Sequence, residues 1–157
     1  MVRRLFVLMV GLALLGGFTV AEAKGKKGDL VLRVATDGNT FDFTDPAGPG
    51  GGAAFYISGV ICADPTLFAF CDPIGMFHCW GWLIGPDQLA AVVSQEYDLD
   101  GRGKIQVQGV EDEGPRAVTG GTGDFRNVRG EATGFDLSDL FVGGEFTATF
   151  KLKGAKK

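Results

Sequence analysis

The sequence is poor in the residues on which many enzyme mechanisms and metal sites depend. Its 157 residues include one histidine and three cysteines, and no two cysteines have the Cys-x-x-Cys spacing. His78 is therefore the single candidate for any histidine-based acid–base or triad mechanism. No serine or cysteine motif marks a nucleophile that could act with it, so the sequence shows no catalytic constellation.

Positive charge and helical periodicity are also scarce. The formal net charge is −4, which argues against nucleic acid as the partner. All lysines but Lys104 lie within residues 24–27 and 151–157, at the two ends of the predicted mature chain, where solvated tails explain them. No apolar repeat is sustained at helical spacing, and only the stretch around residues 86–91 permits about one helical turn.

The N-terminus has the three parts of a secretory signal peptide, predicted to cover residues 1–23. Arg3 and Arg4 precede an apolar run over residues 5–20, and Ala21-Glu22-Ala23 provides a cleavage site. A membrane anchor is the alternative, but the run is short and glycine-rich against the roughly 20 apolar residues that a span needs. We expect a secreted or periplasmic protein with no membrane contact after cleavage.

The rest of the sequence predicts one all-β domain over residues 29–153, between a flexible lead at 24–28 and a basic tail at 154–157. In the last segment Phe146, Ala148 and Phe150 fall on one face and threonines on the other, as in a half-buried strand. Strands are predicted over residues 30–35, 53–62, 77–84, 91–99, 104–110, 116–119, 125–135 and 144–153. Roughly eight short strands with glycine-rich corners favour a barrel or a sandwich, and closure into a barrel removes exposed edges.

The three cysteines predict a disulfide rather than a metal site, because exported proteins favour disulfides. Cys62 and Cys71 flank a short loop, so their disulfide is the first expectation. A bond between Cys71 and Cys79 is the alternative, and the odd count leaves one thiol over. These cysteines with His78 would be the only metal-ligand candidates, and we expect no metal.

No motif predicts a cofactor. The Gly120-Gly121-Thr122-Gly123 loop lacks the helix that a phosphate-binding loop needs behind it. The hairpin turn at residues 98–105 resembles a calcium loop, but Arg102 stands where the ion needs an acidic ligand. We expect glycine-rich corners instead, with positive φ or a bulge.

Residues 77–83 are the most unusual segment. In a strand His78, Trp80 and Trp82 share one face, while Cys79 lies on the other. Two indoles and an imidazole could line a pocket for a flat aromatic guest, or the indoles could simply pack inside the barrel or at a subunit contact. A one-residue shift exchanges the two faces, so the sequence leaves open which of them points inward.

Residues 117–132, AVTGGTGDFRNVRGEA, resemble the GGTGxFRxARG signature of plant dirigent proteins and the related barrel of allene oxide cyclases. The preceding hairpin fits the same pattern through Tyr97, Gly101, Ile105 and Gly109, and so does the closing strand at 145–150. The likeness covers roughly residues 90–153 and is thin over 29–89.

The resemblance implies a closed antiparallel β-barrel of about eight strands, of the calycin type, with a central apolar cavity and commonly three copies in a homotrimer. Dirigents steer the coupling of phenoxy radicals, and allene oxide cyclases direct a ring closure. Within the matched signature, Asp124 and Arg129 stand where dirigents carry functional polar residues. The aspartate pair and histidine that dirigents use in their N-terminal half have no clear counterpart here.

The leading functional prediction is therefore a secreted dirigent-like barrel that binds a small hydrophobic or aromatic molecule in its cavity, without a cofactor. Its ligand-binding residues would be Tyr56, His78, Trp80 and Trp82, with Asp124 and Arg129 near the rim. An isomerase or cyclase is the alternative, in which Glu96 or Asp124 would assist catalysis. A structural domain with a filled barrel is the second alternative.

Overall fold

The computed structural model describes residues 29–36, 42–43, 52–63, 71–84, 91–111, 114–134 and 144–154. The predicted signal peptide, the flexible lead, the helix-permissive stretch as far as residue 90 and residues 155–157 lie outside the described residues, and Ala91 at the end of that stretch begins a strand.

The described residues form nine strands and one 3-10 turn. The strands are β1 (Asp29–Thr36), β2 (Asp42–Phe43), β3 (Ala54–Cys62), β4 (Pro73–Leu83), β5 (Ala91–Leu99), β6 (Gly103–Glu111), β7 (Arg116–Gly121), β8 (Arg129–Thr133) and β9 (Glu145–Lys153). The turn is η2 (Gly123–Phe125).

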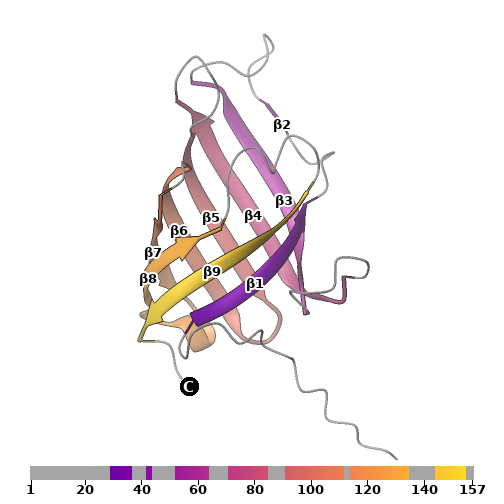
Figure 1. Ribbon diagram of the computed structural model, residues 1–157, viewed down its shortest axis with the longest axis vertical. Coiled ribbons are helices and arrows are strands. Elements are labelled where there is room, and N and C mark those ends of the chain that lie inside the picture. Colours follow the sequence, from indigo (N-terminus) through magenta and orange to yellow (C-terminus); the bar gives the residue numbers. More distant parts are fainter. Residues whose placement is uncertain are drawn as a thin grey trace, which may run out of the picture.

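Eight of the strands close into an antiparallel barrel, which confirms the predicted fold (Figure 1). The order around the sheet is β1-β9-β8-β7-β6-β5-β4-β3, and β1 pairs back onto β3 to complete the ring. The two-residue β2 adds only to β3. In Figure 1, β1 and β9 cross the front of the barrel and β3 to β6 form its far wall.

One predicted strand is shorter than expected. The run at 125–135 begins with the last residue of η2, and the strand starts only at Arg129. Asn127 between them has a left-handed backbone with φ of 65°, which extended pairing does not allow. Residues 125–128, which the sequence pattern assigned to the strand, therefore belong to the corner between β7 and β8.

Four aromatic rings pack against one another inside the barrel. The Phe77 and Tyr97 rings lie 5.0 Å apart, and their contacts with Phe146 and Phe150 join β4 and β5 to β9 across the barrel. These centroid distances are 5.2 Å for Phe77–Phe146 and 4.9 Å for Tyr97–Phe150, within the range in which aromatic pairs attract. The core is the inner face of a closed sheet, as the alternation predicts.

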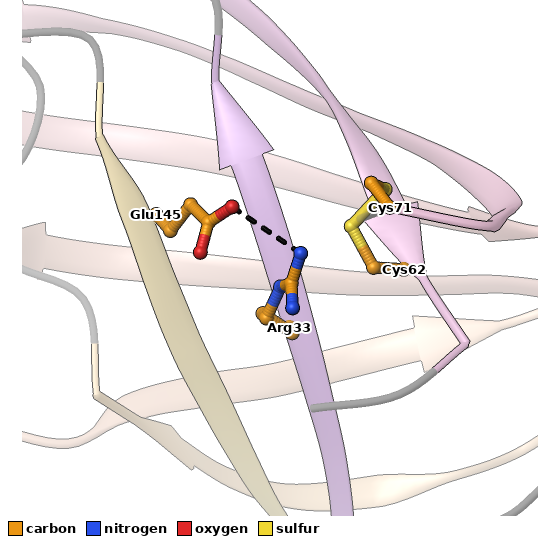
Figure 2. Close-up of a disulfide and its surroundings, with 4 residues drawn as sticks. All are labelled: Arg33, Cys62, Cys71 and Glu145. Atoms are coloured by element: carbon orange, nitrogen blue, oxygen red, sulfur yellow. Dashed lines mark hydrogen bonds and ion pairs between the residues drawn. A yellow bond between two sulfur atoms is a disulfide. The ribbon is translucent and has the colours of Figure 1, made fainter. Parts of the chain in front are cut away.

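The predicted disulfide between Cys62 and Cys71 is present, and it joins the end of β3 to the segment that leads into β4. Cys79 is the remaining thiol and is buried. Cys62 pairs in register with Arg33 of β1, and the Arg33 guanidinium lies 3.2 Å from the Glu145 carboxylate of β9. Figure 2 shows the disulfide and this ion pair close together, where β1 closes the barrel between β3 and β9. A disulfide is compatible with an exported protein.

Candidate functional site: a polar cluster inside the barrel

Five polar or ionisable side chains face inward from β4, β5, β6 and β7. They are Cys79, Gln95, Tyr97, Glu111 and Arg116, each at most 2 % exposed. Strand pairing places Cys79 beside Gln95 and Tyr97 beside Phe77, so the cluster begins at the level of the aromatic rings. Glu111 pairs with Ala91, the first residue of β5, whereas Tyr97 lies near the last. The cluster therefore extends along the barrel axis from the aromatic rings toward the start of β5.

Glu111 lies at the centre of this cluster. The Gln95 amide Nε2 donates a hydrogen bond of 2.6 Å to Glu111 Oε1, and the Tyr97 hydroxyl donates to Gln95 Oε1 over 3.3 Å. Arg116 Nη1 lies 3.9 Å from the same carboxylate oxygen. The Cys79 sulfur lies 3.8 Å from it, within reach of a weak S–H hydrogen bond.

A glycine lets the Arg116 side chain enter the barrel. Gly109 stands on the inner face of β6, and a Cβ added there would lie 3.0 Å from Arg116 Cγ. The aliphatic part of Arg116 therefore lies over the bare backbone of Gly109, and its guanidinium reaches toward Glu111. This arrangement buries a permanent cation next to a carboxylate, which provides the partner that a buried charge requires.

Burial keeps two members of the cluster in their neutral forms. Desolvation, reinforced by the nearby Glu111 charge, raises the pKa of the Cys79 thiol well above its usual 9.0. Desolvation also raises the pKa of the Tyr97 hydroxyl far above its usual 10.0. The site thus presents a carboxylate and a guanidinium beside a neutral thiol, phenol and amide.

The four predicted ligand-binding residues lie on the outer surface of the barrel. Trp80 and Trp82 are 39 % and 52 % exposed, and Tyr56 is 41 % exposed. Tyr56 and His78 are joined by a 2.7 Å hydrogen bond between the phenol oxygen and Nδ1, and their rings stack at 6.1 Å. The expectation that these residues line the interior is therefore wrong, because β4 turns Phe77, Cys79 and Leu83 inward.

The three predicted catalytic residues are separate from the inner cluster and from one another. Glu96 lies on the outer face of β5, where its carboxylate is 2.7 Å from Lys104 Nζ. The Lys104 ammonium donates hydrogen bonds to Glu96 and, with a smaller effect, to Asp98, and these raise the pKa of Lys104 above its usual 10.5.

Asp124 and Arg129 are both exposed, one in the η2 turn and one on β8. Asp124 lies 3.7 Å from the Arg102 guanidinium of the β5–β6 hairpin. Arg129 donates a 2.7 Å hydrogen bond to the backbone carbonyl of Val128. The signature residues thus stabilise the corner that follows β7, and the structure does not bring them together with Glu96.

The sequence of β5 contained one sign of the inner cluster, a polar residue on an otherwise apolar face. Gln95 and Tyr97 occupy the same face of β5 as Val93 and Leu99, so a polar amide interrupts an apolar face. A buried amide on such a face requires a hydrogen-bond partner. The partner, Glu111, is 16 residues away, and only strand pairing identifies it.

Within the part of the chain that the structure describes, no three His, Cys, Asp or Glu side chains form a group that could hold a metal ion. None of the described residues belongs to a helix long and apolar enough to cross a bilayer.

Comparisons with known proteins place the chain by its fold. No protein-family model matches it, and no curated protein is similar to it. Solved structures do match. The chain has the fold of the dirigent-like barrels. This confirms, for the fold, the resemblance carried by residues 117–132.

Two dirigent proteins and one enzyme illustrate the likeness. The pterocarpan synthase dirigent protein PsPTS1 superposes with a TM-score of 0.61 and 17 % identity, over 79 % of this chain and 91 % of that one. Its counterpart GePTS1 gives 0.58 and 15 %, over 82 % and 87 %. Pyocyanin demethylase gives 0.59 and 20 %, over 80 % and 99 %. At these identities the likeness concerns the barrel itself.

Proposed function

We propose that this chain is an exported dirigent-like barrel that binds a small hydrophobic or aromatic molecule among its inward side chains, without a cofactor. The polar cluster around Glu111 carries the proposal. Sites for small molecules combine apolar walls with a few convergent polar groups, and Gln95, Glu111 and Arg116 converge inside an otherwise apolar barrel.

The cluster would orient a ligand through its polar edge. Glu111 and Arg116 supply an acceptor and a donor of opposite charge, and Gln95 supplies an amide beside them. Buried valines, phenylalanines and leucines supply the apolar contacts. The names of the barrels of similar fold refer to pyocyanin and to pterocarpan, which supports a ring-containing organic molecule as the guest.

An isomerase or cyclase is the second candidate, and the inward carboxylate of Glu111 favours it. A positioned carboxylate beside a guanidinium can accept or donate a proton during a rearrangement of a bound molecule. In that case Glu111 replaces Glu96 and Asp124 as the expected acid–base group, because it alone of the three faces the interior.

Native mass spectrometry of the protein purified from the exported fraction of its host tests the binding proposal. A retained adduct gives the mass of the ligand directly, and release under mild denaturation shows that the adduct is not covalent. Absence of an adduct, together with no binding to an added panel of flat aromatic molecules, would contradict the proposal and leave the filled structural barrel.

The matched variants Glu111→Gln and Glu131→Gln test the site within the barrel. Both remove one carboxylate, but Glu111 is buried in the cluster and Glu131 is exposed on β8. We expect Glu111→Gln to weaken the binding of the identified ligand at least about tenfold, the size of one charge-assisted hydrogen bond, and Glu131→Gln to leave it unchanged. Equal affinity for both variants would exclude Glu111 as a ligand contact. Thermal unfolding of each variant shows whether the fold persists.

A further inference from the structure

The start of β1, the end of β9 and the corner before β8 meet at one end of the barrel. β1 begins opposite Lys151 of β9, and Lys153 pairs in register with Arg129 at the start of β8. A Cβ added to Gly154 would lie 3.3 Å from the Asn127 carbonyl oxygen, so the residue after β9 contacts the corner. Figure 1 shows the tip of β9 and the start of β1 together at this end.

Four basic side chains are exposed at this end, and we call them the basic patch: Arg126, Arg129, Lys151 and Lys153. None of them forms an ion pair with another residue that the structure describes. Arg129 and Lys153 are direct cross-strand partners on the outer face, where Cβ atoms lie about 5 Å apart and like charges repel each other. An anion that contacts both side chains removes this repulsion.

The acidic residues nearby leave one row of the basic patch cationic. Three of them adjoin the patch, and they are Asp29, Asp124 and Glu131. The ladder places the first and the third on either side of Lys151, and the second lies 3.7 Å from the Arg102 guanidinium. The row nearer the end of the barrel holds Arg129 and Lys153, and no acidic residue that the structure describes pairs with either of them.

Chain connectivity adds the lysines of both ends of the chain to this end of the barrel. Residues 24–27 hold three lysines and are separated from β1 by one glycine, and residues 155–157 hold two and follow Gly154. In the sequence they are two separate tails, whereas the antiparallel pairing of β1 with β9 ties both to the same end. Nine of the 15 basic residues thus belong to the basic patch or to the segments joined to it, in a chain whose net charge is −4.

The chemistry of the basic patch favours a polymer of carboxylates over a membrane or a nucleic acid. The arginine fork matches a carboxylate through two parallel hydrogen bonds, and the 2.7 Å hydrogen bond to the Val128 carbonyl holds the Arg129 guanidinium in place. Cations spaced about 5 Å across strands and about 7 Å along β9 can contact successive acidic sugars of one chain. None of the large apolar side chains that are exposed in the described residues lies on η2, β8 or β9, so the patch has no group to insert into a bilayer or to stack on bases.

We propose that the basic patch binds a linear anionic polysaccharide through its carboxylates. Arg129 and Lys153 contact one carboxylate together, and Arg126 and Lys151 contact its neighbours along the polymer. The predicted export of the chain brings it into the compartment in which such polymers occur. The proposal does not depend on a ligand in the interior, because the patch lies on the outer surface of the barrel.

Calorimetric titration with polygalacturonate at low ionic strength tests the proposal, with dextran as the uncharged polymer. The matched variants Lys153→Gln and Lys104→Gln have the same net charge, but Lys104 lies on β6 beside Glu96 and Asp98. We expect Lys153→Gln to weaken the binding of polygalacturonate about fivefold and Arg129→Gln/Lys153→Gln at least tenfold, as for one and two cations beside an anionic surface. Lys104→Gln should change the affinity by no more than about twofold, because solvent and salt screen a distant exposed charge. Added salt should weaken the binding of the wild type more steeply than that of the double variant, because the wild type releases more counterions.

A wild type that does not bind polygalacturonate, or that binds dextran equally well, would overturn the proposal, and so would a double variant with unchanged affinity. Tighter binding to vesicles of phosphatidylglycerol and phosphatidylcholine, or to duplex DNA, would also overturn it, because the patch would then have a different partner. Arg126→Gln is the second variant if the double variant fails to fold, and circular dichroism with an intact Cys62–Cys71 disulfide verifies the fold. The readout is binding to a polymer, whereas the interior site is tested by an added ligand mass. Failure of one is therefore distinguishable from failure of the other.

Discussion

At the scale of single residues, Cys79 shows how the barrel interior controls protonation. Its thiol lies among Gln95, Glu111 and Tyr97 with no exposed surface. Forming a thiolate there would place a second negative charge beside Glu111, away from water. The native state therefore holds its thiol proton more tightly than the unfolded chain does.

This linkage predicts a loss of stability at alkaline pH. Below pH 9 both states carry the thiol proton and Cys79 contributes nothing to the slope. As the pH rises above the usual pKa of 9.0, the unfolded chain loses the proton and the native state keeps it. The free energy of unfolding should then fall by up to about 1.4 kcal/mol per pH unit for this group.

Urea unfolding at pH 7, 9 and 10 measures the effect, with Cys79→Ala as the comparison. The variant should be less stable at neutral pH, because a buried side chain is truncated, but its stability should fall less between pH 9 and 10. Parallel pH profiles for the two proteins would show that Cys79 does not titrate differently on unfolding. Tyr97 adds its own loss only above its usual pKa of 10.0.

At the scale of elements, the corner after β7 explains the glycine-rich signature. Thr122 N donates to the Lys104 carbonyl and Thr122 Oγ1 accepts from Lys104 N, so the corner binds the start of β6. Asp124 N donates to the Arg102 carbonyl, and the Arg102 guanidinium lies 5.2 Å from the centre of the Phe125 ring. Gly123 has φ of 56°, as a glycine corner predicts. The signature loop at residues 122–125 therefore packs directly against the β5–β6 hairpin at residues 102–104.

Replacing each of two neighbouring glycines in this corner with alanine should affect stability very differently. A Cβ at Gly121 would collide with the backbone carbonyls of Lys104 and Phe125, whereas a Cβ at Gly120 would find nothing closer than the Arg129 guanidinium at 3.6 Å. Gly121→Ala should lower the free energy of unfolding by at least about 2 kcal/mol. Gly120→Ala should change it by no more than about 0.5 kcal/mol. Equal unfolding midpoints in urea would contradict this account of the corner.

At the scale of the whole molecule, closure of the barrel depends on the pairing of β1 with β3. This pairing aligns four residue pairs, Arg33–Cys62 to Thr36–Gly59, whereas β4 and β5 align nine. The Arg33–Glu145 ion pair and the Cys62–Cys71 disulfide lie where this short pairing begins (Figure 2). The ion pair joins β1 to β9, and the disulfide joins the end of β3 to the segment before β4, so both stabilise the strands that take part in this pairing.

Removing the disulfide should therefore destabilise the entire barrel rather than one loop. The cysteines are nine positions apart. A disulfide that closes a loop of this size lowers the conformational entropy of the unfolded chain and so stabilises the native state by about 2.5 kcal/mol. The double variant Cys62→Ala/Cys71→Ala should melt in one transition at a lower temperature, and a reducing agent should lower the melting temperature of the wild type but not of the variant. A wild type whose melting temperature is insensitive to full reduction would show that the bond does not support closure.

Features that depend on neighbouring residues in the chain could be predicted from the sequence. Alternation in 144–153 and 91–99 predicted the strands, and Asp100-Gly101-Arg102-Gly103 predicted the β5–β6 hairpin, because side-chain period and turn chemistry are local. Cys62 and Cys71 were paired correctly, since a short loop favours that bond over the alternative with Cys79. The order of the signature and its flanking strands indicated the barrel.

Which face of each strand the barrel encloses, and which distant residues meet there, follows only from the pairing of strands that are far apart in the sequence. Alternation in 77–83 is equally consistent with Trp80 or Cys79 inside, and the choice follows from the packing of Phe77 against Tyr97 and Phe146. Glu111, Gln95 and Arg116 come from three strands, so no local pattern joins them. The strand register places Trp80 and Trp82 on the outer face and Glu111 on the inner face. The candidate site is therefore the cluster around Glu111, because the interior exists only once distant strands have paired.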